Sequence, residues 1–157
     1  MSGITVRIEL LEPMRVASVR AISQTPERDA WEKLQVWAEG QGLLEDPEAN
    51  PVFGFNNPSP TRGGGIYGYE YWIRIGPHVA IAGGIEAKDF PGGLYAVTTC
   101  KLFGDPTGTV MDVWKKLADW VTLNGHKWRK THELERLHDP RVSGDEIVLD
   151  LYLPIES

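Results

Sequence analysis

The sequence reads WEKLQVW at residues 31–37 and WKKLADW at residues 114–120, so the pattern W-x-K-L-x-x-W occurs twice. A glycine follows each copy five residues later, at Gly42 and Gly125, and the two copies hold four of the six tryptophans of the chain. Apolar residues recur in both copies at intervals of three and four residues, which is typical of a helix with one apolar face. The repeat predicts two related helices, and we infer that the chain contains an internal duplication.

Strand patterns surround the two predicted helices in the same order. Alternating apolar residues predict strands before the first helix, from residue 4 and from residue 14, and one before the second helix, from residue 94. After the helices, residues 69–73 and 149–153 share one pattern, in which an acid is followed two positions later by an aromatic residue. Each half of the chain therefore predicts a β-α-β-β unit.

These elements predict an α+β fold with two layers. We expect an antiparallel sheet with both helices on one face, built from two β-α-β-β repeats that are related by a pseudo-twofold axis. The chain is expected to form a single domain over residues 1–157, with repeat halves at about 1–76 and 77–157. The tryptophan faces of the helices are expected to supply most of the core, because large aromatic rings bury much apolar surface.

Composition restricts the class of function. The 157 residues include 16 Lys and Arg against 22 Asp and Glu, and the net charge of −6 opposes direct binding to a phosphate backbone. Cys100 is the only cysteine, which excludes an intrachain disulfide and a cysteine-rich metal site. The N-terminus lacks the pattern of a signal peptide, and the chain lacks an apolar run long enough for a membrane span. We therefore expect a cytoplasmic protein that does not bind membranes.

One face of the predicted sheet carries acids beside aromatic residues. If the helices cover the face with Tyr69 and its alternating neighbours, the opposite face presents Glu70 with Trp72 and Asp150 with Tyr152. A carboxylate beside aromatic planes suits a flat, cationic and partly apolar ligand, because the rings stack on it and the acid balances its charge. The alternative interpretation is that both acids are solvated positions on the wet face of the sheet.

The whole pattern resembles the GyrI-like (gyrase-inhibitor-like) family. The resemblance is carried by the repeated β-α-β-β order and by YGYEY at residues 67–71, FPGGLYAV at residues 90–97, LERL at residues 134–137 and DLYLPI at residues 150–155. Domains of this family occur alone or attached to AraC-type and MerR-type multidrug regulators. No helix-turn-helix pattern precedes the first strand, so we expect a stand-alone domain.

The resemblance implies an aromatic-lined pocket between the two halves that accepts hydrophobic and often cationic compounds. Glu135 matches the family's pocket glutamate, and we expect it to be at least half buried beside aromatic rings. Its expected partners lie on the open sheet face: Glu70, Trp72, Asp150 and Tyr152, with Tyr95 and Phe55 as rim aromatics. Leu137 stands where family members often have tyrosine, and Asp150 stands where they usually have glutamate. The expected function is small-molecule binding of the multidrug-sensor type, with a role in transcription regulation.

Two alternative functions follow from the same resemblance. Some relatives resemble hydrolases that open strained cyclopropane rings, in which a pocket glutamate would activate water. The gyrase inhibitors that gave the family its name suggest instead a protein-interaction module. The sequence does not separate these alternatives, and it assigns no catalytic residue, natural ligand, protein partner or oligomeric state.

Motifs for cofactors and metals are absent or misplaced. Residues 63–68 match G-x-G-x-x-G, but a proline-rich loop precedes them and a strand follows, whereas a dinucleotide site needs a strand before and a helix after. His126, His132 and His138 lie six residues apart, which does not place them on one helical face. We therefore expect neither a cofactor nor a metal ion.

Overall fold

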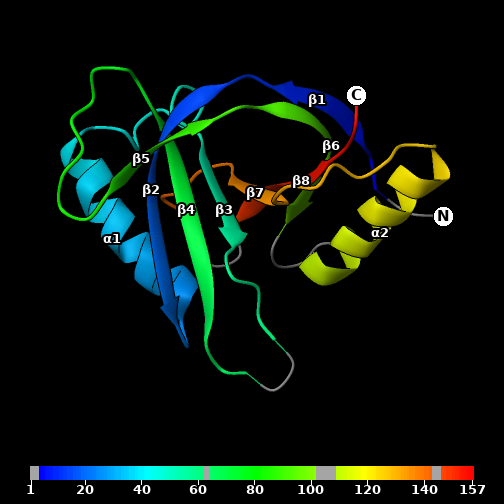
Figure 1. Cartoon of the computed structure of the whole chain (residues 1–157), viewed down its shortest axis with the longest axis horizontal. Helices are drawn as coiled ribbons and strands as arrows, with labels where there is room; N and C mark the ends of the chain where they lie inside the picture. Colours follow the sequence, from blue (N-terminus) through cyan, green and yellow to red (C-terminus); the bar gives the residue numbers. More distant parts are fainter. Residues whose placement is uncertain (1–3, 62–63, 102–108, 143–145) are drawn as a thin grey trace. The chain divides into compact units, whose positions relative to one another are not determined.

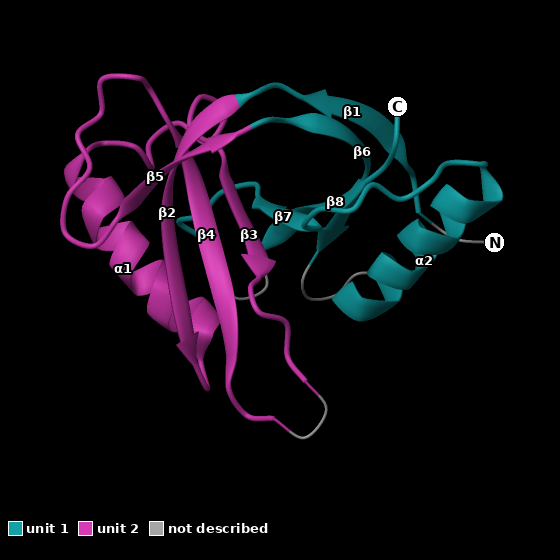
Figure 2. Ribbon diagram, viewed as in Figure 1, with its two compact units in different colours: residues 1–13, 91–157 teal, residues 14–90 magenta. Residues whose placement is uncertain are grey.

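The computed structural model describes residues 4–61, 64–101, 109–142 and 146–157. Its elements, in chain order, are β1 (Arg7–Leu11), β2 (Met14–Ser23), α1 (Pro26–Gly40), β3 (Val52–Asn56), β4 (Tyr67–Ile75), β5 (Glu86–Phe90), β6 (Gly93–Lys101), α2 (Val110–Leu123), β7 (Leu134–Leu137) and β8 (Val148–Pro154). The chain divides into two compact units (Figure 2). Unit 1 comprises Met1–Pro13 and Pro91–Ser157, and unit 2 comprises Met14–Phe90.

Unit 2 is a four-stranded antiparallel sheet with one helix. Its strands pair in the order β5-β2-β4-β3, and α1 packs against β2 and β4 (Figure 1). The helix buries Ala30, Leu34 and Ala38, which recur at helical spacing. The Trp31 ring lies 5.4 Å from the Tyr71 ring, so α1 covers the face of β4 that carries Tyr71.

Unit 1 has the corresponding arrangement. Its strands pair in the order β1-β6-β8-β7, and α2 packs against β6 and β8. A capping box starts α2, because the Thr109 side chain accepts a hydrogen bond from the Asp112 amide while the Asp112 carboxylate accepts one from the Thr109 amide. The buried side of α2 contributes Val113, Leu117 and Val121 to a core with the leucines of β8.

The two units therefore share one order of elements, β2-α1-β3-β4 and β6-α2-β7-β8, as the sequence repeat predicts. The α+β class and the antiparallel pairing are confirmed, whereas a pseudo-twofold axis stays a prediction. The glycines that end the repeat, Gly42 and Gly125, have φ angles of 70° and 77°, a conformation that costs glycine little and other residues much.

Each sequential half of the chain contributes one edge strand to the sheet of the other half. β1 pairs with β6 although β2 follows it in sequence, and β5 pairs with β2 although β6 follows it. The compact units therefore differ from the sequential halves 1–76 and 77–157. The sequence pattern missed β5 because its EAKDF sequence has no apolar alternation.

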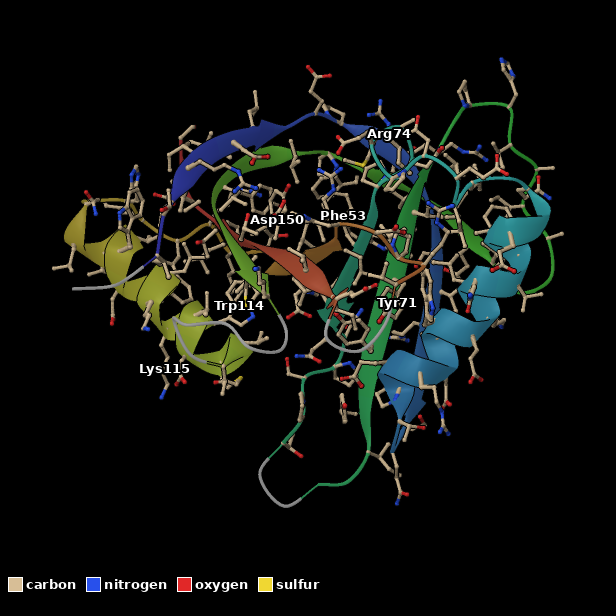
Figure 3. The ribbon with its side chains drawn as sticks, turned by 180° about the vertical axis from the view of Figure 1, so that it is seen from behind. Phe53, Tyr71, Arg74, Trp114, Lys115 and Asp150 are labelled. Carbon is tan, nitrogen blue, oxygen red and sulfur yellow. The ribbon has the colours of Figure 1, made fainter. Side chains whose placement is uncertain are left out.

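The helix tryptophans are not the main source of the core, which corrects the expectation from the sequence. Trp31, Trp37, Trp114 and Trp120 are all only partly buried. Trp114 lies on the side of α2 that faces the sheet of unit 1, while Lys115 points away (Figure 3). Smaller aliphatic residues fill the central positions of both helices, because a helix packed close to a sheet leaves little room for an indole ring there.

Neither helix in the described segments has the length and apolar character that crossing a membrane requires.

Substitutions in α2 test this distribution of the core. Leu117→Ala should lower the free energy of unfolding by about 2–5 kcal/mol, because it leaves a cavity at a fully buried position. Trp114→Ala should cost less than about 3 kcal/mol, because part of the indole already contacts water. Urea denaturation of both variants measures the two free energies of unfolding. A larger decrease for Trp114→Ala than for Leu117→Ala would contradict the prediction.

Candidate functional site

Unit 2 gathers an acid and several aromatic rings on the sheet face opposite α1. Successive residues of a strand point to opposite faces, so Glu70 and Trp72 point away from the helix that contacts Tyr71. The pairing register adds residues of β2, β3 and β5 to the same side. We call this surface the Glu70 face; it comprises Ser18, Phe53, Phe55, Glu70, Trp72, Lys88 and Phe90.

The Glu70 carboxylate is buried and fully hydrogen-bonded. Glu70 is 1% exposed. Its Oε2 accepts hydrogen bonds from Ser18 Oγ at 2.6 Å, Trp72 Nε1 at 2.6 Å and Lys88 Nζ at 2.8 Å. Its Oε1 accepts one from Asn57 Nδ2 at 3.0 Å. A buried carboxylate needs such donors, because an unpaired charge is costly away from water.

These donors determine the protonation state of Glu70. Burial by itself raises the pKa of the Glu70 carboxyl, but the hydrogen bonds from Lys88, Ser18, Trp72 and Asn57 outweigh it, and the pKa lies below its ordinary value of 4.5. The group is therefore ionised at neutral pH. The interpretation of Glu70 as a solvated position on a wet face is wrong.

Aromatic rings surround this charge. The Phe55 and Trp72 rings lie 4.8 Å apart in an edge-on arrangement, and the Trp72 and Phe90 rings lie 5.3 Å apart. Phe53 and Phe55 are 2% and 3% exposed. The face thus combines a carboxylate, paired with Lys88, with aromatic surface, and carboxylate and aromatic rings together favour apolar cations.

Unit 1 carries a second buried acid in the corresponding position. Asp150 is 5% exposed, so it is not a solvated position either. Its Oδ1 accepts a hydrogen bond from Thr99 Oγ1 at 2.7 Å and lies 2.7 Å from His138 Nε2, while Oδ2 pairs with Arg7 Nη2 at 2.9 Å. Burial raises the pKa of Asp150, but its bonds to Thr99 and His138 and the charges of His138 and Arg7 outweigh it and lower the pKa.

Two buried tyrosines lie on the same face of unit 1 as Asp150. Tyr95 and Tyr152 are both 0% exposed, and their rings lie 5.7 Å apart in an edge-on arrangement. The Tyr152 hydroxyl donates to Glu9 at 3.3 Å, and burial is the main reason why the pKa of Tyr152 is raised to about 12. The Arg129 guanidinium lies 4.9 Å from the centre of the Tyr95 ring.

Within the described part of the chain no group makes a hydrogen bond of good geometry to the Tyr95 hydroxyl, since the neighbouring Arg129 guanidinium lies over the ring. Burial raises the pKa of Tyr95, and Arg129 opposes this only in part. The group therefore stays protonated, and it is a neutral donor and acceptor in a position that water does not reach. A buried polar group of this kind is uncommon in proteins and indicates a place for a further hydrogen-bonding partner.

Glu135 lies on a different face from the one expected. It pairs in register with Leu151, which belongs to the core beneath α2, whereas its neighbour Leu134 pairs with Tyr152. Glu135 is partly buried and accepts a hydrogen bond from Trp114 Nε1 at 3.4 Å. It therefore sits beside an aromatic ring as predicted, but on the helix side of the sheet and away from the face of Asp150 and Tyr152.

Of the expected site residues, the structure brings Phe55, Glu70 and Trp72 together in unit 2 and Tyr95, Asp150 and Tyr152 together in unit 1. Sequence reasoning missed the partners of the acids, among them Lys88 and Arg7. Arg7 carried a signal, because it alternates with the apolar residues of a predicted strand. In the described segments, no three His, Cys, Asp or Glu side chains form a group that could hold a metal ion.

The model of the GyrI-like small molecule binding domain family matches residues 4–156. The chain belongs to this family. The match covers nearly the whole sequence, so the resemblance seen in the repeat and in the strand motifs is confirmed. No curated protein sequence matches this GyrI-like chain.

Solved structures share the GyrI-like fold at low sequence identity. A chain of the EcmrR–DNA complex has a TM-score of 0.72 and 15% identity; the match covers 100% of this chain and 59% of that one. A hydrolase from Listeria innocua has a TM-score of 0.67 and 12% identity, with 97% and 92% of the two chains covered. The structure of SAV2435 bound to tetraphenylphosphonium has a TM-score of 0.55 and 10% identity, with 98% and 94% covered. At these identities the likeness concerns the fold.

The lowered pKa of Glu70 predicts a pH dependence of stability. Because the folded pKa lies below the ordinary value of 4.5, ionised Glu70 contributes stability above that value, and the contribution is lost as the pH falls through the folded pKa. Glu70→Gln should therefore be less stable than the wild type at neutral pH, and its stability should fall less steeply in acid. Urea denaturation between neutral pH and pH 3 measures the free energy of unfolding of both proteins, and its slope against pH gives the comparison.

Glu45→Gln, at an exposed position, is the control and should keep the wild-type slope. Part of the acid dependence should remain in Glu70→Gln, because Asp150 also has a lowered pKa. Identical slopes for the wild type and Glu70→Gln would contradict the prediction.

Proposed function

We propose that this chain binds small aromatic compounds that carry a positive charge, and that the Glu70 face of unit 2 supplies the binding groups. The proposal is carried by one observation: an ionised carboxylate is buried beside Phe55, Trp72 and Phe90 on a sheet face without a helix of its own unit. Removing a bulky apolar cation from water costs less than removing a small, strongly hydrated one, and aromatic rings with a carboxylate compensate its charge.

Membership in a small-molecule-binding family supports a ligand of this size. SAV2435, which shares the fold, was solved with tetraphenylphosphonium, a cation surrounded by aromatic rings. We infer the same chemical class for this chain from its own residues. A binding domain of this type would act as a sensor or sequestering protein for such compounds, with a role in transcription regulation when it contacts a regulator.

We also propose that the Tyr95 hydroxyl of unit 1 hydrogen-bonds to a ligand. It is buried and without a partner in the described segments, and Tyr152 and Asp150 lie on the same face. Ligand atoms that accept a hydrogen bond would satisfy it. Asp150 is a weaker candidate for a ligand cation than Glu70, because Arg7 and His138 already pair with it.

Hydrolysis is the second candidate, because the fold is shared with a Listeria innocua hydrolase. A glutamate that activates water works best as a base when its pKa lies close to the operating pH. The hydrogen bonds that lower the pKa of Glu70 and Asp150 make these two acids poor bases, so at these two positions binding is favoured over hydrolysis. Incubation with a cyclopropane-containing alkylator, followed by mass spectrometry of the product, decides between the two functions.

A matched pair of ligands tests the proposed role of Glu70. N-methylacridinium and acridine have nearly the same shape, and at mildly alkaline pH only the former is charged. Glu70→Gln should weaken N-methylacridinium binding roughly 10- to 150-fold, the range expected for loss of a charge-assisted contact in a desolvated site, and acridine binding by less than about twofold. Tryptophan fluorescence quenching measures both affinities.

Asp150→Asn and Glu135→Gln are the matched controls, since each removes one partly or fully buried acid elsewhere in the chain. If Glu135→Gln gives the selective loss instead, the charge is supplied on the helix side of unit 1 and the assignment to Glu70 is wrong. Equal losses for both ligands in Glu70→Gln would indicate damage to the fold.

Tyr95→Phe tests the unpaired hydroxyl. In the ligand-free protein it should raise the free energy of unfolding by about 1 kcal/mol or leave it unchanged, because a buried hydroxyl without a partner is removed. Tyr152→Phe is the control and should lower it by about 1 kcal/mol, because the bond to Glu9 is lost. Thermal or urea unfolding measures both, and a clear loss of stability in Tyr95→Phe would show that its hydroxyl has a structural partner.

A further inference from the structure

We propose that Lys88 is an internal competitor for cationic ligands: in the ligand-free protein its ammonium group occupies the place on the Glu70 carboxylate that the positive charge of a ligand takes. This proposal rests on the proposed function of the Glu70 face and adds how that face selects its ligands. Binding of a cation is then an exchange, in which Lys88 moves into water as the ligand charge arrives.

The hydrogen bonds of Glu70 show why an exchange is required. Oε2 accepts three hydrogen bonds, from Ser18, Trp72 and Lys88, and Lys88 also balances the carboxylate charge. Lys88 is the one donor of the four that carries a charge. Lys88 Nζ lies 2.8 Å from Glu70 Oε2. A cation that arrived while Lys88 stayed there would therefore meet a carboxylate whose charge is already balanced, and it would be repelled by the ammonium group.

Lys88 is also the donor that can leave at least cost. Its side chain is 41% exposed, whereas Ser18 and Trp72 are 3% and 9% exposed. It stands on β5, the five-residue edge strand of unit 2, and its stem of four methylene groups can swing without movement of the backbone. The ammonium regains water when it leaves, so the exchange replaces one ion pair by another and never leaves Glu70 uncompensated.

The exchange has a consequence for specificity. A neutral aromatic compound that contacts only the rings leaves the Lys88–Glu70 pair intact, so Lys88 does not oppose it. A cation must outcompete Lys88, which favours weakly hydrated, bulky cations over small hydrated ones, because the former have less water to lose. The lysine thus acts as a specificity-determining residue and keeps a buried carboxylate paired while the site is empty.

Affinity measurements on Lys88→Met test the exchange. Methionine keeps much of the apolar stem but has no charge, so N-methylacridinium should bind roughly 3- to 10-fold more tightly than to the wild type, as for loss of a partly exposed competing ion pair. Acridine affinity should change by less than about twofold. Mildly alkaline pH is used, because the loss of Lys88 removes an interaction that lowers the pKa of Glu70.

Two variants serve as controls. Lys88→Arg keeps the cation and should bind N-methylacridinium no more tightly than the wild type does. Arg20 lies opposite Glu70 in the register and is exposed, without an ion pair to Glu70 in the described segments. Arg20→Met therefore removes a positive charge from the position next to Glu70 without vacating the carboxylate, and it should leave both affinities within about twofold. Unfolding curves of all variants confirm that they are folded.

A second measurement follows the amine itself. Acetic anhydride should acetylate Lys88 faster when N-methylacridinium is bound than in the free protein, because the amine is then released from Glu70. Lys115, which points away from the core of unit 1, is the reference and should react equally in both states. Peptide mass spectrometry gives both rates.

The outcomes separate the two proposals. If the wild type binds N-methylacridinium through Glu70 but Lys88→Met does not bind it more tightly, or if ligand slows acetylation of Lys88, then Lys88 is not displaced and this inference is wrong while the binding function stands. If neither the wild type nor Lys88→Met binds either ligand, both proposals are wrong. Tighter binding of the cation alone by Lys88→Met, with Lys88→Arg binding it no more tightly than the wild type, supports both.

Discussion

The burial of the Glu70 carboxylate is the constraint on which much of unit 2 depends. At 1% exposure the charge can exist only if protein donors replace water, and the four donors come from β2, β4, β5 and the residue after β3. The same hydrogen bonds thus hold separate strands in one register and keep the acid ionised. The Glu70 carboxylate therefore serves two purposes: its hydrogen bonds connect the strands of unit 2, and its charge lies beside the aromatic rings to which we assign ligand binding.

Unit 1 satisfies the same constraint with different chemistry. Asp150 occupies in β8 the position that Glu70 occupies in β4, and each is followed two residues later by an aromatic residue. The shorter acid is paired with Arg7 and His138 instead of a lysine. Arg7 reaches Asp150 through Nη2 and binds Glu9 and Thr99 with its other nitrogens. The two acids are therefore paired differently, with an arginine and a histidine in unit 1 and with a lysine in unit 2.

Family membership and local chemistry contribute separate parts of the functional argument. The GyrI-like match places the chain among small-molecule-binding domains, while the shared fold extends to proteins as different as a Listeria innocua hydrolase and a chain of the EcmrR–DNA complex. A common fold does not determine a common reaction, so the assignment must come from the site. The lowered pKa values of both buried acids indicate groups that hold charge, as binding requires, and not groups that take up protons from water.

The sequence by itself determined the repeat, the two helices, the α+β class and the pairs of acid and aromatic residue. All of these follow from local periodicity, which is 3.6 residues in a helix and two residues in a strand. Only the tertiary structure decided the exchange of β1 and β5, the choice of aliphatic residues over tryptophans for the core, and the face on which Glu135 lies. Strand register sets the last of these, since a shift by one residue moves a side chain to the other face. The role of Lys88 could not be predicted from the sequence, because its segment, EAKDF, has no periodicity that indicates a strand. Lys88 contacts Glu70 only because β5 pairs with β2, which lies far away in the sequence.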